Sequence, residues 1–162
     1  MQEIGSAGLF SHLFTKPIYT LAEPVSIKFK NLEHKSVESP QLLFLFKNAF
    51  NQEIPESDFE LLRKMAAWLG VAGDNTACHL CNGKNLSFRE LTVTQGIENI
   101  IGCGITPADI TLNIDYEINR AIRFMNCKLL FTVSFAEVQK NEMLKKEFFN
   151  EAGKLFNHLK GK

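Results

Sequence analysis

The stretch "LLFLFK", residues Leu42–Lys47, is a run of five apolar side chains closed by a lysine. Apolar residues at consecutive positions are typical of a strand that is covered on both faces, as in a parallel sheet. Three more stretches have this character: "TACHLCN" (Thr76–Asn82), "IENIIGCGI" (Ile97–Ile105) and "CKLLFTVS" (Cys127–Ser134). The four runs predict four buried strands.

Helix signals lie between and after these strands. Ser57 and Glu60 have the spacing of a capping box, and Gly70 stands where a helix that starts there would end. Ser134 and Glu137 repeat the capping box after the fourth strand. The sequence therefore predicts a helix after the first strand and another after the fourth.

Three further segments carry helical patterns. "TPAD" (106–109) places a threonine cap before a proline, which favours a short turn of helix. The segment "DYEINRAIRFM" (115–125) has apolar residues at helical spacing, at Ile118, Ala121, Ile122 and Met125. A last amphipathic helix is expected from Asn141 onward, with its apolar stripe at Leu144, Phe148, Ala152, Leu155, Phe156 and Leu159.

The alternation of strands and helices predicts an α/β fold, a three-layer α/β/α sandwich around a short, mainly parallel four-stranded sheet. The chain of 162 residues suits a single domain, which we expect to span residues 25–162. "VSIKFK" (25–30) alternates apolar and polar residues, as in an edge strand or extended arm. Residues 1–24 form a separate apolar N-terminal arm that contains "LFSHLFTKPIYTLAEP" (9–24).

The composition argues against several classes of function. Eighteen basic residues balance eighteen acidic ones, so the charge attraction that nucleic-acid binding requires is weak and no direct nucleic-acid contact is expected. No apolar run is long enough for a membrane span, and no secretion signal begins the chain. The four cysteines lie in or beside strand-like runs, which indicates reduced, buried thiols and a cytoplasmic protein.

The segments that follow the four predicted strands contain no histidine, no nucleophile with a base and no paired carboxylates. Cys78 and Cys81 have zinc-ligand spacing, but no second pair completes a site, and residues three apart on a strand point to opposite faces. The glycines at Gly102 and Gly104 lack the spacing of a phosphate loop and favour close packing or a tight turn. We therefore predict no catalytic, cofactor-binding or metal-binding residue.

The order of these elements resembles the psi subunit of bacterial DNA polymerase III, a small accessory protein of the clamp loader. The matching stretches are "LFTKPIYTL" (13–21, with Phe14 and Tyr19), "LLFLFKNAF" (42–50) and "LLFTVSFAEVQKNEMLKKEFFNEAGKLF" (129–156). The order of elements is similar over nearly the whole chain. The family carries a tryptophan where Tyr19 aligns. The resemblance implies a role in DNA replication as a non-catalytic protein-interaction subunit.

The resemblance also implies partners and a fold. In that family the N-terminal peptide binds the clamp-loader ATPase subunits, and the α/β body binds the chi subunit. The corresponding partner-binding residues here are Leu9, Phe10, Leu13, Phe14, Ile18 and Tyr19. The family's fold is similar to that of uracil-DNA glycosylases, yet the loops that follow the first and last strands lack the glycosylase motifs.

Three alternatives stay open at this point. The chain is an enzyme or nucleotide-binding domain of the glycosylase-like fold that uses "NGKNLS" (82–87) and "GCGITPAD" (102–109); or its apolar N-terminus makes a homodimer; or that N-terminus covers the sheet of its own domain.

Overall fold

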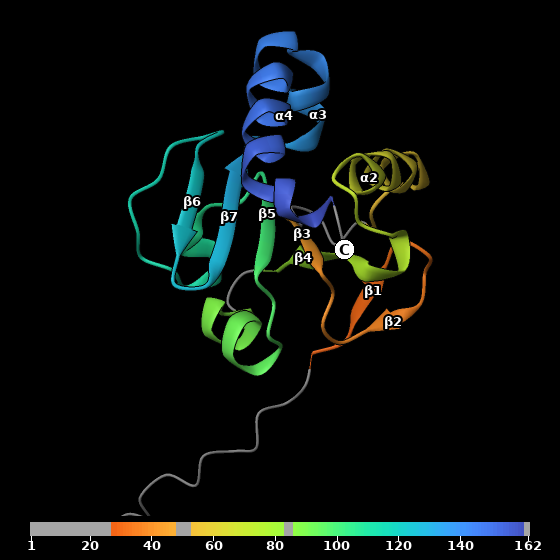
Figure 1. The fold of residues 1–162 in the computed structure, drawn as a ribbon, viewed down its shortest axis with the longest axis vertical. Helices are drawn as coiled ribbons and strands as arrows, with labels where there is room; N and C mark the ends of the chain where they lie inside the picture. Colours follow the sequence, from red (N-terminus) through yellow and green to blue (C-terminus); the bar gives the residue numbers. More distant parts are fainter. Residues whose placement is uncertain (1–26, 48–52, 83–85, 161–162) are drawn as a thin grey trace, which may run out of the picture.

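The computed structural model describes residues 27–47, 53–82 and 86–160 (Figure 1). In these residues seven strands form one sheet in the order β2-β1-β4-β3-β5-β7-β6. The strands are β1 (Phe29–Asn31), β2 (Ser36–Val37), β3 (Leu42–Lys47), β4 (Thr76–Cys81), β5 (Asn99–Cys103), β6 (Ala121–Phe124) and β7 (Cys127–Thr132). The α/β class predicted from the sequence is therefore confirmed.

The prediction of a four-stranded sheet is wrong, although the four predicted strands are present and parallel. They form the centre of the sheet as β4-β3-β5-β7, where Leu43 pairs with Ala77 on one side and with Ile100 on the other. The additional strands β1, β2 and β6 are antiparallel and lie at the two edges. The strand pattern expected at 25–30 is met in part by β1, whereas β2 and β6 were not predicted, because they are two and four residues long and carry no continuous apolar run.

The predicted helical pattern at 115–125 is also wrong, because this segment ends in strand β6. The β6–β7 hairpin turns at Met125, whose φ of 53° is left-handed, so that Phe124 pairs with Cys127. Ile122 and Phe124 alternate with exposed Ala121 and Arg123, which is the period of a strand. Pairing with β7 thus overrides a helical spacing that four apolar residues produce by chance.

The structure has three α-helices in its described residues, α2 (Glu56–Trp68), α3 (Phe135–Lys140) and α4 (Glu142–Phe156). Shorter turns are the 3-10 helices η1 (Gly73–Asn75), η3 (Pro107–Ile110) and η4 (Asn157–Leu159) and the π-helical turn η2 (Glu90–Thr94). The short helical turn expected after Thr106 and the long helix expected after Asn141 are both confirmed.

The two ends of α2 give different outcomes. The predicted capping box of Ser57 and Glu60 does not form, because the helix begins earlier, at Glu56, directly after Pro55. The backbone oxygen of Pro55 accepts the first helical bonds. The other end is as predicted: Gly70, with a φ of +81°, adopts the left-handed conformation that ends a helix at low cost.

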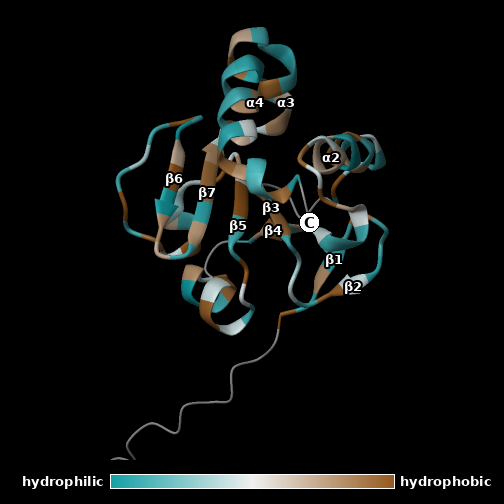
Figure 2. Cartoon of the chain, viewed as in Figure 1, coloured by the Kyte–Doolittle hydropathy of each residue, from teal (hydrophilic) through white to brown (hydrophobic). Residues whose placement is uncertain are grey.

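The sheet separates two cores, and Figure 2 shows its central strands as largely hydrophobic. We call the side covered by α2, α3 and α4 the helical face. Its buried residues include Leu42, Phe44, Met65, Cys78, Cys103, Leu130, Phe148 and Phe156. We call the opposite side the loop face, where residues 86–97 and 105–112 cover Leu43, Leu45, Ala77, Ile100, Leu129 and Phe131. The predicted α/β/α sandwich therefore has a helical layer on one face only. Within the described ranges, short turns and loops cover the loop face.

No helix in the part of the chain that the structure describes is long and apolar enough to span a membrane.

Candidate functional site

The central strands define where a ligand of this fold would bind. Taken in chain order, the parallel strands β3, β4, β5 and β7 lie in the order 2-1-3-4, as in a doubly wound sheet. The connections from β3 and β5 then leave toward opposite faces, and the crevice outside their carboxyl ends is the usual ligand site. The segments that follow the strands are therefore the first place to look for chemistry.

Each segment that follows β4, β5 and β7 starts a helical turn with a hydroxyl residue and a carboxylate three positions later. Thr106 donates to the Asp109 carboxylate from its backbone N–H at 2.6 Å and from its hydroxyl at 2.9 Å. Ser134 makes the same two bonds to Glu137, at 3.1 and 2.6 Å. The sequence predicted the Ser134–Glu137 capping box, and at Thr106 it predicted a threonine cap.

The third capping box follows β4 and was not predicted. The Ser87 backbone N–H and hydroxyl donate to the Glu90 carboxylate at 3.0 and 2.9 Å, and the Glu90 N–H donates back to the Ser87 hydroxyl at 3.2 Å. The Ser-x-x-Glu spacing is present in the sequence, but it lies in the segment "LSFRELTVTQ" (86–95), whose irregular pattern made the capping box hard to recognise. All three turns therefore use their own carboxylates to satisfy backbone donors that an anion would otherwise bind.

Gly102, inside β5, and Gly104, just after it, meet the demands of close packing and of a tight turn. A Cβ on Gly102 would lie 2.6 Å from Cδ1 of Phe131 and 2.8 Å from Cγ1 of Ile105, so only glycine fits. Gly104 has a φ of +70° and donates its N–H to the oxygen of Thr132 at 3.0 Å. The prediction of close packing and a tight turn is confirmed.

The four cysteines are free and buried. Cys78 belongs to the core of the helical face and Cys81 to that of the loop face, as the strand period predicted. Burial raises the pKa of both thiols to about 11 and that of Cys103 to about 12. At neutral pH these groups are protonated thiols, which are poor nucleophiles and poor metal ligands.

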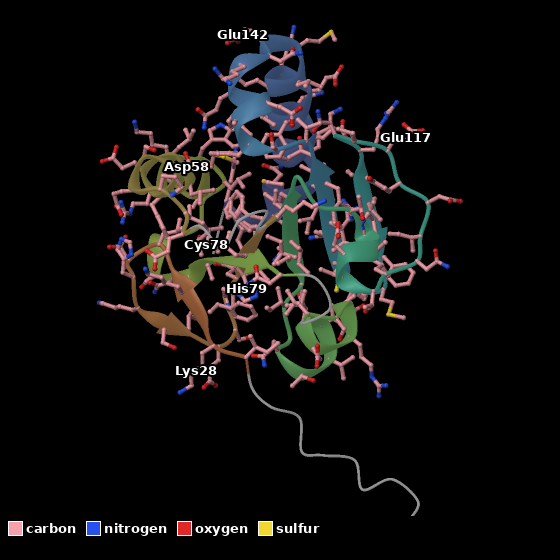
Figure 3. All side chains as sticks on the ribbon, turned by 180° about the vertical axis from the view of Figure 1, so that it is seen from behind. Lys28, Asp58, Cys78, His79, Glu117 and Glu142 are labelled. Carbon is pink, nitrogen blue, oxygen red and sulfur yellow. The ribbon has the colours of Figure 1, made fainter. Side chains whose placement is uncertain are left out.

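His79 lies between the two cysteines of β4, near the middle of the body in Figure 3. Its half-buried ring meets the edge of the Phe29 ring at 5.6 Å, and burial lowers its pKa below the usual range for histidine. Within residues 27–47, 53–82 and 86–160, no three histidine, cysteine, aspartate or glutamate side chains are grouped to hold a metal.

The helical face contains an apolar hollow between α2 and the α3–α4 hairpin. Its volume is about 240 Å³, and its lining is Leu61, Met65, Phe135, Val138, Gln139, Lys145, Phe148 and Phe149. Leu61 and Met65 are four residues apart and so share one side of α2. We call this space the α2–α4 hollow.

An exposed aromatic cluster extends the same seam toward the end of α2. Trp68 is 42% exposed, and its ring meets the edge of Phe149 at 5.3 Å. The ammonium of Lys160 lies 4.8 Å from the centre of the Trp68 ring. Gly153 lets the indole approach α4, since a Cβ there would lie 3.1 Å from Cη2 of Trp68. Sequence reasoning missed the hollow because it is formed by two helices that are distant in the chain.

The predicted partner-binding residues lie outside the residues that the structure describes: Leu9, Phe10, Leu13, Phe14, Ile18 and Tyr19. Their role stays a prediction. No protein-family model matches the chain, and no curated protein matches it.

Proposed function

We propose that this protein is a non-catalytic interaction subunit, similar in role to the psi accessory subunit of a bacterial clamp loader. The three capping boxes are the observation that carries the proposal. In segments that follow β4, β5 and β7, the backbone donors are already bonded to Glu90, Asp109 and Glu137. These carboxylates would repel a phosphate and already occupy one backbone donor in each of the three turns, which disfavours a nucleotide at these turns.

The helical face has apolar surface of the kind that an interaction subunit needs. The α2–α4 hollow is lined mainly by aromatic and aliphatic groups, with Gln139 and Lys145 as its polar members. Beside it the partly exposed Trp68 offers a large rigid side chain of the type that dominates protein interfaces. The resemblance to the psi family supplies the partners: the clamp-loader ATPase subunit for residues 9–19 and a chi-like subunit for the α/β body.

Capture of the tagged full chain from its own cells tests this proposal. We expect the clamp-loader ATPase subunit and a chi-like subunit to be recovered together, as measured by quantitative mass spectrometry. The double variant Phe10→Ala/Phe14→Ala removes two anchors and should lower ATPase-subunit recovery at least about tenfold. The matched variant His12→Ala/Thr15→Ala changes neighbours in the same segment and should leave it unchanged. Recovery of neither subunit by the unmodified chain would overturn the proposal.

The second candidate is a small-molecule or nucleotide site at the carboxyl ends of β3 and β5, which the 2-1-3-4 strand order favours. A thermal-shift series with nucleotides and divalent cations distinguishes it from the first. One ligand that raises the melting temperature by several degrees would favour this candidate. No shift with any of them is the result expected for an interaction subunit.

A further inference from the structure

The α2–α4 hollow has the shape and chemistry of a receptor for a few apolar side chains. Phe148 is fully buried at its base, while Leu61 and Phe149 are half-buried on its α2 and α4 sides. A cavity of about 150 Å³ is enough to hold benzene, so the hollow's volume of about 240 Å³ accommodates one aromatic ring with part of a second side chain. An occupant must therefore present closely spaced aromatic and aliphatic groups.

The chain itself carries such a group of side chains. Leu9, Phe10, Leu13 and Phe14 recur at intervals of one, three and four positions, the spacing that suits insertion into a groove between helices. We infer that these residues of one copy occupy the α2–α4 hollow of a second copy, so that the protein forms a reciprocal homodimer. The inference uses the same apolar segment as the proposed function but concerns the chain alone.

The length of the connecting segment favours the second copy over the chain's own hollow. The described chain begins at Ile27, which packs against the core of the loop face, whereas the hollow belongs to the helical face. Figure 1 also shows the start of the described chain and the α3–α4 hairpin at opposite ends of the body. The segment would have to pass around the sheet to reach its own hollow.

The segment before Ile27 is too short for a path around the body. A domain of this length has a radius of gyration of about 15 Å, hence a diameter of about 40 Å and a surface path of about 60 Å between opposite ends. The twelve residues 15–26 span at most about 43 Å when fully extended. Phe14 therefore falls short of such a path by about 17 Å, and Phe10 comes close to spanning it only with all of residues 11–26 extended to about 58 Å.

A second copy removes this restriction. In a twofold dimer of antiparallel bodies, the lower end of each copy lies beside the α3–α4 end of the other. The N-terminal segment of each copy then crosses only a short gap to the hollow of the other copy. Both hollows are filled by the same pair of surfaces, which is the closed twofold symmetry common to homodimers. Exchange of an identical segment between copies needs no new surface.

Sedimentation equilibrium of the full chain over a dilution series provides the first test. We expect a dimer that dissociates on dilution. Phe10→Ala/Phe14→Ala should raise the dissociation constant at least about tenfold, and so should Leu61→Lys, which puts a charge into the hollow. The controls are His12→Ala/Thr15→Ala for the segment and Ala67→Lys for α2, where Ala67 is exposed. Both controls should stay within about twofold of the unmodified chain.

Disulfide crosslinking identifies which hollow is occupied. One chain carries Ser11→Cys and the other Gln139→Cys, and the native thiols react slowly because their raised pKa keeps them protonated. Mixing the two chains should give a crosslinked dimer, whereas Ser11→Cys mixed with Arg123→Cys, on the exposed part of β6, should not.

Two results would overturn the inference. One is a chain carrying both Ser11→Cys and Gln139→Cys that crosslinks within itself, and the other is a monomer at every concentration. A monomer that still captures clamp-loader subunits would remove this inference and leave the proposed function intact. A dimer that captures neither clamp-loader subunit would support this inference and overturn the proposed function.

Discussion

The two faces of the sheet are covered in different ways. On the helical face, α2 and the α3–α4 hairpin are regular helices that leave the α2–α4 hollow between them. On the loop face, short turns pack so closely that Gly102 has no room for a Cβ against Phe131. Regular helices are stiff units that meet at few points, whereas short irregular segments follow the sheet and fill the available space.

This difference leaves preformed apolar surface on the helical face. Near the amino ends of β3 and β5, the Asn99 side chain donates to the backbone oxygen of Gln41, and the Ser39 hydroxyl donates to that of Gln95. The helical face combines a hollow with the partly exposed Trp68. A partner that binds the helical face meets preformed apolar surface and does not have to unfold the core.

The largest effect is expected in thiol reactivity, which should be low in both cores. Each core holds two cysteines, Cys78 and Cys103 on the helical face and Cys81 and Cys127 on the loop face. A pKa raised from 9.0 to about 11 lowers the thiolate population at pH 8 about 100-fold, so alkylation by iodoacetamide should slow by at least that factor. Cys103, with a pKa of about 12, should be the slowest. Mass spectrometry of time points measures each site.

The order in which the four thiols react shows whether the two cores open separately. If Cys81 and Cys127 react together before the other pair, the loop face opens as a unit of its own. A single cysteine that reacts as fast as the free amino acid in the native protein would contradict the assignment of all four as inert core thiols.

A smaller effect should follow from adding one methyl group on each face. Gly102→Ala places a Cβ against Phe131 and Ile105, and such overpacking should lower the free energy of unfolding by about 1–3 kcal/mol. Val138→Ile adds its methyl beside the α2–α4 hollow, where space exists, and should change that free energy by less than about 1 kcal/mol. Urea unfolding of both variants measures the difference. Equal costs would show that the hollow closes in solution.

Much of the helical face and of the central sheet could be predicted from the sequence. Two kinds of local pattern each predicted one structure. The continuous apolar runs of β3 and β7 predicted strands, and the apolar stripe at Phe148, Ala152 and Leu155 predicted helix α4. The edge strands could not be predicted in the same way. β2 has only two residues, and β6 exists because β7 offers a partner along the whole of Ala121–Phe124.

In the candidate site, too, local features could be predicted from the sequence and contacts between distant segments could not. Asp109 and Glu137 each belong to a capping box of four consecutive residues, a local pattern that can be recognised in the sequence. The α2–α4 hollow brings Leu61 beside Phe149, two residues that are 88 positions apart. No local pattern encodes that contact, because it depends on how far α2 stands from the hairpin.

The smallest effect concerns how the helical face begins after β7. Hydrogen bonds from the Ser134 hydroxyl and backbone N–H lower the pKa of Glu137. Since the pKa is lower in the folded than in the unfolded state, the carboxylate stabilises the fold at neutral pH, and this contribution is lost as the pH falls below about 4.5. Glu137→Gln should therefore flatten the pH dependence of unfolding in that range, as followed by urea titrations from neutral to acidic pH.

Two serine substitutions complete this test, because the same Ser-x-x-Glu spacing occurs twice on the helical face with different outcomes. Ser134→Ala removes a cap that the structure contains and should lower the free energy of unfolding by about 1 kcal/mol. Ser57→Ala changes the residue that the spacing predicts as a cap, but α2 begins at Glu56, so the change should stay within about 0.5 kcal/mol. Equal losses would mean that α2 starts at Ser57 in solution, and the α2 end of the hollow would then shift with it.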